Sequence, residues 1–358
     1  MDTGWRRCAA VLTGWLIAGL ALACVCTTAG AAEVHEVHSG YEYYAVGRTP
    51  GVAPAKTSPG LLLMGGGREI DAAFTWFASQ AGHGHIVIIR ASGDDALQNW
   101  LYNQVGGVES VQTIIFHARA PASDARILAI LRHADGVFIA GGDQANYVRF
   151  WKDTPVNAVL NAHVRAGRPL GGTSAGLAIL GEWGYGALDG GSITATSALS
   201  DPGGPAVTLV GDFLSLPRLK GIITDTHFVQ RGRLGRLLAF VARTARDQGT
   251  AAIAGLGVDQ DSALLVDADG RARFLSWHRD GRAWVVVPQT LREVERGGGR
   301  LALAAYLKGR VNAGQPLDLP GFKIIGVGQN SVLHLPDGTV TNPAFVRYVD
   351  VVAGQMRP

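Results

Sequence analysis

Cysteine is almost absent from this 358-residue chain, because its three cysteines, Cys8, Cys24 and Cys26, all lie near the start. Beyond residue 26 the missing thiols exclude a disulfide scaffold, a cysteine nucleophile and a thiolate metal site. The chain also lacks a marked excess of charge, since its formal charge at pH 7 is only +3. Such a small excess gives no reason to expect nucleic acid or an anionic membrane as a partner.

The first 31 residues have the layout of a secretory signal peptide. Arg6 and Arg7 precede an apolar stretch at residues 8–25, and small residues follow up to Ala31. This order predicts cleavage after Ala31, which would lower the formal charge from +3 to +2 by removing Asp2 and the two arginines. A retained membrane anchor is the alternative, because the apolar stretch approaches the length of a bilayer span. We expect a secreted or periplasmic protein that meets the membrane only through this leader.

From residue 60 onward, short apolar stretches alternate with longer segments typical of helices. Continuous apolar stretches of this length fit strands buried on both faces, so the pattern predicts an α/β domain over residues 60–265 with a mostly parallel sheet and helices on both faces. The expected strands are at residues 61–64, 85–89, 111–116, 137–140, 169–171, 219–224 and 251–258, and a helix is expected at residues 69–79. In such sheets the ligand site lies beyond the carboxyl ends of the strands.

The two ends of the chain differ from this central pattern. Residues 32–59 contain several glycines and prolines and are expected to form an irregular lead-in. Residues 266–358 contain short apolar stretches separated by turns such as Asp280-Gly281 and Asp337-Gly338, which are typical of antiparallel hairpins. We therefore expect a β-rich C-terminal extension packed on the α/β domain.

Residues 172–176, Gly-Thr-Ser-Ala-Gly, match the G-x-S-x-G nucleophile elbow. An extended segment precedes them and a helix-like segment, residues 177–180, follows, as an elbow requires. Ser174 is then the candidate nucleophile, held in a strained bend that exposes its hydroxyl. A chain with 49 glycines can produce this match by chance, and the alternative is an ordinary helix-capping serine.

A serine needs an adjacent base, and His227 is the best candidate because it follows an expected strand and so lies at a strand's carboxyl end. A third residue should orient the imidazole. Asp189 is favoured because it gives the order Ser, Asp, His along the chain. The other candidate acids are Glu182, Asp201 and Asp259.

The loop that follows residues 137–140 can supply part of an oxyanion hole. Backbone N–H groups of Gly142 or Asp143, together with that of Ala175, would face the attacked carbonyl. Gln144 would project into the site as an amide ligand for substrate. His83 and His85 have no carboxylate companion nearby, so we expect neither a metal ion nor another cofactor.

Three arginines, Arg231, Arg233 and Arg236, follow the candidate base at the expected start of a helix. Cations are unfavourable at a helix N-terminus, and a bound anion would offset that cost. The arginines therefore predict recognition of a substrate carboxylate. A solvated basic helix face is the alternative.

Residues 141–144, 171–176 and 225–228, followed by the spaced arginines, resemble the cyanophycinases of the S51 serine peptidases, which are relatives of dipeptidase E. The resemblance covers residues 60–265. It implies a fold similar to class I glutamine amidotransferases, with serine in place of their cysteine. It also implies hydrolysis of cyanophycin, a poly-aspartate backbone that carries arginine on its side chains, to β-aspartyl-arginine dipeptides. The catalytic positions that it implies are Ser174, His227 and Asp189, and the substrate-binding positions are Gln144, Asp225, Arg231, Arg233 and Arg236.

Two departures from the family pattern bear on the substrate. Thr226 occupies a position in the recognition loop where the family usually has glutamine, and residues 194–197 lack a pair of glutamates that many relatives carry. We expect an exported serine exopeptidase that hydrolyses cyanophycin or a β-aspartyl peptide through an acyl-enzyme, and a homodimer is a candidate assembly. The alternatives are an S51 aspartyl or isoaspartyl dipeptidase, an esterase, and a non-catalytic binding homologue. An esterase would be expected to carry an HGGG-type loop, which the chain lacks.

Overall fold

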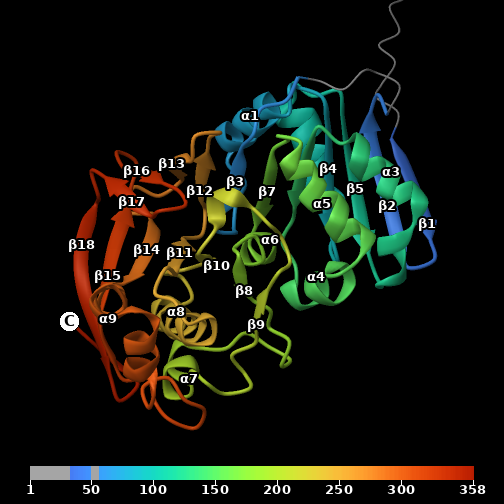
Figure 1. Ribbon diagram of the computed structural model, residues 1–358. Coiled ribbons are helices and arrows are strands. Elements are labelled where there is room, and N and C mark those ends of the chain that lie inside the picture. Colours follow the sequence, from blue (N-terminus) through green and yellow to red (C-terminus); the bar gives the residue numbers. More distant parts are fainter. Residues whose placement is uncertain (1–32, 50–55) are drawn as a thin grey trace, which may run out of the picture. The chain divides into compact units, whose positions relative to one another are not determined.

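The computed structural model describes residues 33–49 and 56–358, which belong to one compact unit (Figure 1). The expected leader lies outside the described residues. None of the helices in the described part of the chain is long and apolar enough to cross a membrane.

The first sheet has the order β1-β2-β5-β4-β6-β7-β3-β12-β13-β16-β17, and its five central strands from β5 to β3 run parallel. The outer strands pair antiparallel. The strands are β1 (Val34–His38), β2 (Tyr41–Gly47), β3 (Leu61–Met64), β4 (His85–Arg90), β5 (Ser110–Phe116), β6 (Gly136–Ile139), β7 (Leu170–Thr173), β12 (Ser262–Val266), β13 (Arg271–Ser276), β16 (Val332–His334) and β17 (Thr339–Thr341).

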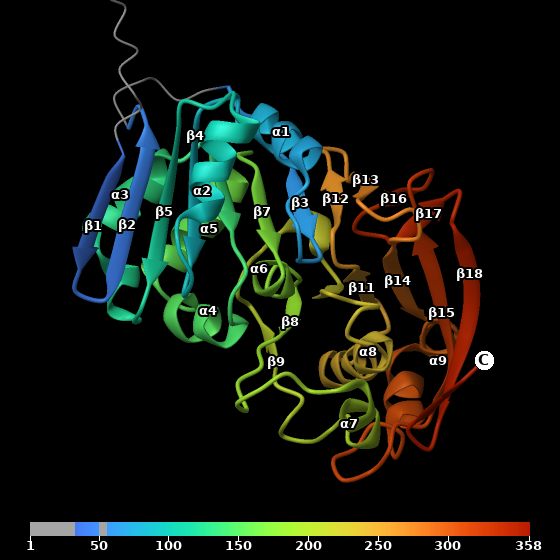
Figure 2. The same ribbon diagram turned by 180° about the vertical axis from the view of Figure 1, so that it is seen from behind.

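Helices cover both faces of this sheet, as the buried strands require. In β4, Val87 and Ile89 pack into one hydrophobic cluster, whereas Ile86 and Ile88 pack into another, because successive side chains point to opposite faces. The helices α3 (Ala125–His133), α4 (Gln144–Trp151) and α5 (Pro155–Arg165) cover the first face, and α1 (Asp71–Gln80) and α2 (Ala96–Trp100) cover the second (Figures 1 and 2). Single turns complete this part at η1 (Leu101–Val105) and η2 (Ala120–Ser123).

The second sheet has the order β19-β18-β15-β14-β11-β10-β8-β9. Its strands β8, β10 and β11 are parallel, and the others pair antiparallel. The elements of this part are β8 (Trp183–Tyr185), β9 (Leu209–Gly211), β10 (Ile222–Asp225), β11 (Ala254–Val258), β14 (Ala283–Pro288), β15 (Leu319–Val327), β18 (Phe345–Val352), β19 (Gln355–Arg357), α6 (Ala175–Ala178), α7 (Ala195–Ser200), α8 (Leu234–Gln248), α9 (Gln289–Leu307) and η3 (Pro217–Leu219). Side chains of α8 and α9 pack into one cluster with β15.

The expected irregular lead-in is wrong for the residues that the structure describes there. Residues 34–38 and 41–47 form the hairpin β1-β2, and β2 pairs with β5. Tyr41, Tyr43 and Ala45 are buried at alternate positions, so the hairpin extends the sheet with one face on the core.

The expected hairpins of the C-terminal region are present, but they divide between the two sheets. Strands β13, β16 and β17 extend the first sheet, whereas β14, β15, β18 and β19 extend the second. The region also contains α9, which was not expected from the sequence. The division of the chain at residue 265 stays a prediction.

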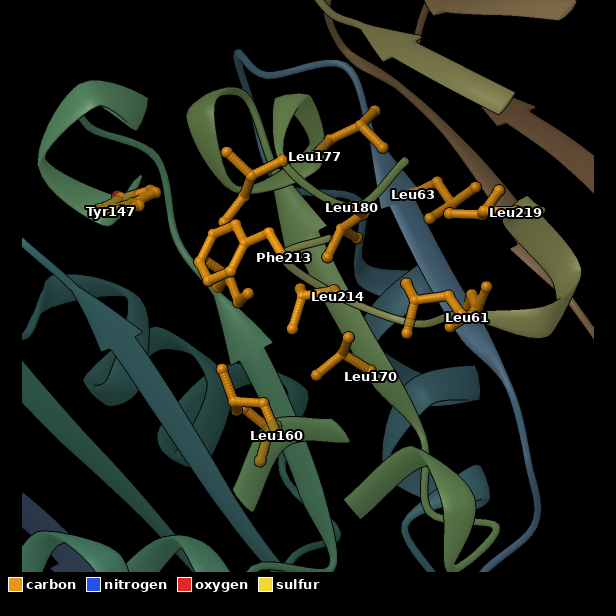
Figure 3. Packing of buried hydrophobic residues seen from close by; sticks show 14 of the residues in the cluster. Leu61, Leu63, Tyr147, Leu160, Leu170, Leu177, Leu180, Phe213, Leu214 and Leu219 are labelled. Atoms are coloured by element: carbon orange, nitrogen blue, oxygen red, sulfur yellow. The ribbon is translucent and has the colours of Figure 1, made fainter. Parts of the chain in front are cut away.

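Apolar side chains fill the space beneath the candidate elbow (Figure 3). Leu177 and Leu180, which directly follow the elbow, are fully buried in one cluster with Leu61, Leu63 and Leu170. The strand that enters the elbow and the segment that leaves it are therefore both anchored in the core. This anchoring holds a strained turn in place between them.

Candidate active site

Ser174 lies in the turn between β7 and α6, as the motif predicted. Its backbone has φ of 53° and ψ of −119°, a strained conformation for a residue with a side chain. A Cβ at Gly176 would come within 2.0 Å of the Ile139 carbonyl oxygen, so only glycine permits this close approach of α6 to β6. The sequence pattern thus has a steric cause, and it presents a half-buried serine at the end of a strand.

His227 contacts the serine directly, although it comes from the other sheet. It follows β10, and its Nε2 lies 2.7 Å from Ser174 Oγ. The sequence predicted two strand ends on one edge of a single sheet, and that detail is wrong because β7 and β10 belong to different sheets. The pair itself is formed as predicted.

The end of β3 and the residues directly after it connect the nucleophile and the base. The Ser174 N–H donates to the Met64 carbonyl at 3.1 Å, and the His227 N–H donates to the Gly65 carbonyl at 2.8 Å. Gly66 lies against the imidazole, with φ of 92°, and a Cβ there would come within 2.3 Å of His227 Cε1. One short segment therefore fixes both members of the pair.

Gln260 is the residue that contacts the second ring nitrogen of His227. Its Oε1 lies 3.1 Å from Nδ1 and accepts a hydrogen bond from it, which leaves Nε2 free to accept from Ser174. Gln260 lies between β11 and β12 and was missed in the sequence. The usable signal was its place just after an expected strand that ends at Val258.

Asp189 does not occupy the third position. It is exposed in the loop after β8, and no hydrogen bond of its carboxylate is recorded within the described residues. The loop Gly190-Gly191 that follows offers no packing to hold a side chain, since a Cβ at either glycine would meet nothing within 4 Å. The expectation from chain order is therefore corrected by the position of Gln260.

The other candidate acids are also engaged elsewhere. Glu182 accepts from the N–H of Gly221, and Asp201 accepts from that of Gly314. Asp259 is buried and accepts from the N–H groups of Val229 and Arg282 and from Trp284 Nε1, so it supports the loop that carries His227. Burial raises the pKa of Asp259 above its usual value.

The pKa of His227 is held below its ordinary value. Burial is the main cause, since a buried site disfavours the charged imidazolium, and the positive charges of Arg231 and Arg233 act in the same direction. The hydrogen bond to Gln260 opposes the shift. The ring is therefore neutral at pH 7, the state that a general base requires.

The loop after β6, which carries two of the expected oxyanion groups, lies beside the serine. A Cβ at Gly141 would lie 3.5 Å from Ser174 Cβ, so the loop after β6 lies against the nucleophile. Tyr147 Oη lies 2.9 Å from the Ala140 carbonyl oxygen and 2.8 Å from that of Gly141, and its single hydrogen, shared between them, helps to orient that loop. No partner is recorded within the described residues for the N–H groups of Gly142, Asp143 and Ala175.

Asp225, Thr226, Arg233 and Arg236 form a buried network beside the pair. Arg236 is only 1% exposed and makes two bonds to the Asp225 carboxylate, with Nε at 2.7 Å. Arg233 donates to Asp225 at 3.3 Å and to the Thr226 carbonyl at 2.8 Å. Burial lowers the pKa of Arg233 to about 10. These four side chains bond to one another and hold the loop that carries His227, and their direct contact with substrate stays a prediction.

Two of the expected substrate ligands remain accessible. Arg231 is exposed, has no recorded hydrogen bond of its guanidinium within the described residues, and lies near enough to lower the pKa of His227. Gln144 is half-buried at the start of α4, where its Nε2 makes a long contact of 3.4 Å with the Tyr185 carbonyl. Asp143 is exposed and caps α4 by accepting from the Ala145 N–H.

The remaining histidines of the central domain have local partners. His83 Nδ1 contacts the Gly107 carbonyl, and His85 Nδ1 contacts Ser110 Oγ at 2.8 Å. Among the described residues, no group of three or more histidine, cysteine or acidic side chains is arranged to hold a metal ion.

Comparisons with known proteins agree with this geometry. Residues 61–199, which include the elbow, match the sequence model of Peptidase family S51. The chain is 28% identical to the cyanophycinase of Trichormus variabilis over 80% of this chain and 89% of that protein. It is 32% identical to the cyanophycinase of Synechococcus elongatus over 60% of this chain and 65% of that protein.

Solved structures similar to this chain include two peptidases. A peptidase from an acI-B1 Actinobacterium aligns with a TM-score of 0.47 and 14% identity, over 64% of this chain and 90% of that one. A putative peptidase E from Listeria monocytogenes aligns with a TM-score of 0.40 and 17% identity, over 62% of this chain and 99% of that one. The match of residues 61–199 to the S51 family model and the similarity to cyanophycinases show that the chain is a serine-type peptidase similar to those of family S51.

Proposed function

We propose that this peptidase hydrolyses cyanophycin and releases β-aspartyl-arginine dipeptides. The observation that carries the proposal is the 2.7 Å contact between Ser174 Oγ and His227 Nε2 at a strained elbow. The similarity to proteins named cyanophycinase, over 80% of this chain in one case, supports the substrate.

The reaction begins when Ser174 Oγ attacks a backbone carbonyl of the polymer and His227 Nε2 takes the hydroxyl proton. The N–H groups of Ala175 and of Gly142 or Asp143 stabilise the resulting oxyanion. His227 then gives the proton to the leaving amine, which leaves an acyl-enzyme on the serine. Water, deprotonated by the same imidazole, releases the product and restores the serine.

Gln260 acts as the positioning residue in this mechanism. Its amide oxygen accepts the Nδ1 proton at 3.1 Å, so the tautomer with a free Nε2 is the one that faces the serine. A glutamine cannot supply the negative charge that stabilises an imidazolium in serine peptidases with an acidic third member. The pair therefore depends on orientation more than on a carboxylate.

Substrate recognition uses the charge around the pair. Arg231 is exposed next to His227, and a guanidinium forms strong bonds to carboxylates. Each unit of cyanophycin carries a free carboxylate on its arginine, and the chain end carries another. Arg231 binds one of these groups, and Gln144 contacts a backbone amide. Binding of a chain end makes the enzyme an exopeptidase, and export through the leader gives it access to polymer outside the cell.

Product analysis with purified cyanophycin tests this function. Wild-type protein is expected to release β-aspartyl-arginine, identified by mass spectrometry, whereas Ser174→Ala is expected to lose about 10⁴-fold or more in rate. Ser79→Ala, which removes an exposed hydroxyl on α1, is the matched control and should keep full activity. Undiminished release of the dipeptide by Ser174→Ala would exclude the serine as nucleophile.

A panel of isoaspartyl dipeptides tests the alternative dipeptidase function with the same proteins. Hydrolysis of these dipeptides together with no release from the polymer would reject cyanophycin as the substrate. Labelling of wild type by a serine-directed phosphonate, and its absence in Ser174→Ala, separates both enzymes from a non-catalytic binding homologue.

A further inference from the structure

A cavity lies at the edge of the second sheet that is opposite to the catalytic pair. It has a volume of about 900 Å³, and its lining includes Glu182, Gly221 and Ala254, which stand at the amino ends of β8, β10 and β11. His227, in contrast, follows the carboxyl end of β10. The cavity is therefore separate from the site described above, and its size is in the range of small-molecule sites, roughly 300–1,000 Å³.

Four cationic side chains line this cavity. Arg292 and Arg296 are one helical turn apart on α9 and so lie on the same side of the helix. Gly299, with φ of 69°, interrupts α9, and Arg300 follows the interruption. Lys220 joins them from the loop before β10. Like charges at this helical spacing repel each other, so the arrangement is unfavourable when nothing lies between them.

Three carboxylates also line the cavity, those of Glu182, Glu295 and Asp337, but among the described residues none of them forms an ion pair with Arg292 or Arg296. Glu295 accepts from the Ala251 N–H at 2.8 Å, and Glu182 accepts from the Gly221 N–H at 2.5 Å. Arg292 donates only to the Ala251 carbonyl, at 3.3 Å, and no ion pair of Arg292 or Arg296 is recorded within the described residues. Burial, together with the charge of Arg296, lowers the pKa of Arg292. Both guanidiniums thus keep donors that no described acceptor satisfies.

We infer that this cavity binds a small polyvalent anion, carrying carboxylate or phosphate groups, between Arg292 and Arg296. Planar guanidiniums match the oxygen pairs of both groups, and an anion with several charges can satisfy two arginines at once. Arg300 and Lys220, which also line the cavity, supply further positive charge. Binding here adds a second ligand site to the peptidase, on the other edge of the sheet that carries its base.

Isothermal titration calorimetry with inorganic phosphate and, separately, with citrate tests the site at fixed ionic strength. Saturable binding of at least one anion to the wild type is expected, and the anion that binds identifies the source as phosphate or carboxylate. Arg292→Gln and Arg296→Gln are each expected to raise the dissociation constant of the anion by about 10-fold or more. Arg132→Gln removes the same charge from an exposed position on α3 and should leave binding unchanged.

Three results would overturn the inference: no saturable binding of either anion, binding that Arg296→Gln leaves unchanged, or equal weakening by Arg132→Gln. Arg296 is exposed and has no recorded hydrogen bond of its side chain within the described residues, so this variant carries the test even where Arg292→Gln fails to fold. The titration does not measure hydrolysis, so its outcome is independent of the proposed peptidase reaction.

Discussion

At the residue scale, the neutral partner of His227 has a direct chemical effect. An amide oxygen fixes the tautomer but adds no charge that would stabilise the imidazolium. Burial and the neighbouring arginines lower the pKa of the ring further. The base therefore stays unprotonated into weakly acidic solution, although a lower pKa also makes it a weaker proton acceptor.

Replacing this amide by a carboxylate should move the pH profile. In Gln260→Glu the negative charge favours the protonated ring, so the pKa of His227 rises and the acidic limb of kcat/KM shifts to higher pH. Gln260→Ala leaves Nδ1 without its acceptor and is expected to lower kcat by about 10- to 100-fold, a part of what a positioned base contributes. Steady-state kinetics with cyanophycin, recorded as kcat and as kcat/KM against pH, measure both effects.

Gln230→Glu is the control for the added charge. Its side chain is exposed, and its Oε1 accepts from the Gln260 N–H rather than contacting the ring. Gln230→Glu should shift the acidic limb of the kcat/KM profile by much less than Gln260→Glu does. Equal shifts in the two variants would mean that the contact with Nδ1 has no special role.

The sequence predicted the nucleophile and base but not the residue that orients the base. The G-x-S-x-G motif identified Ser174, and His227 was identified because it follows an apolar strand whose carboxyl end is expected at a ligand site. Position after a strand also made Asp259 a candidate for the third residue. Gln260, the next residue, was not considered because glutamine is not a residue type expected in a triad. Asp189 was chosen for its order in the chain, which contains no information on distance.

At the scale of elements, the Asp225 network joins β10 to α8 and to the loop before α7. Arg236 lies on α8, bonds to Asp225 at the end of β10 and donates to Ser192 Oγ at 2.7 Å. Its guanidinium also lies over the rings of Tyr185 and Phe240, at 5.3 and 5.7 Å. Arg236 therefore forms an ion pair with Asp225 and also packs against two aromatic rings. These contacts offset the unfavourable position of a cation in the first turn of α8.

Breaking this network should cost stability, and removing the exposed arginine should not. Arg236→Gln leaves a buried carboxylate with a weaker partner and is expected to lower the free energy of unfolding by about 3–5 kcal/mol. Arg231→Gln should change it by less than about 0.5 kcal/mol but raise KM for cyanophycin. Urea unfolding and steady-state kinetics measure the two effects. Similar stabilities for the two variants would contradict the structural role of Arg236.

Some elements were harder to predict than others for physical reasons. Residues 61–64 and 86–89 are continuous apolar stretches, and the strands that contain them were recognised from that alone. Helix α9 was missed because Gly297-Gly298-Gly299 interrupts its pattern and has low helix propensity. The hairpin β1-β2 was missed because its buried positions are tyrosines and alanine among polar residues.

At the scale of the whole molecule, one buried histidine should make folding depend on pH. His163 on α5 contacts the Pro169 carbonyl through Nε2 at 2.9 Å, and its buried Nδ1 has no partner among the described residues. Burial lowers its pKa to about 4. Because the pKa in the folded protein is below the unfolded value, the stabilisation is complete above pH 6.5 and is lost as pH falls towards 4.

This loss amounts to about 3 kcal/mol between pH 7 and pH 4, from the difference between the two pKa values. His163→Gln cannot titrate, so its free energy of unfolding should decline less over the same range, whatever its value at pH 7. Urea denaturation of both proteins at several pH values measures the slopes. Parallel slopes would show that His163 is not the titrating group.

Residues 64–66, at the end of β3, affect how the active site tolerates substitutions elsewhere in the chain. Ser174 is hydrogen-bonded to Met64 and His227 to Gly65. The distance between nucleophile and base is therefore set mainly by residues 64–66 rather than by the many contacts between the two sheets. Substitutions on distant helices or outer strands can accumulate without altering that separation. For the same reason, a small backbone shift at residues 64–66 would separate Ser174 from His227 and abolish activity, although neither residue is itself changed.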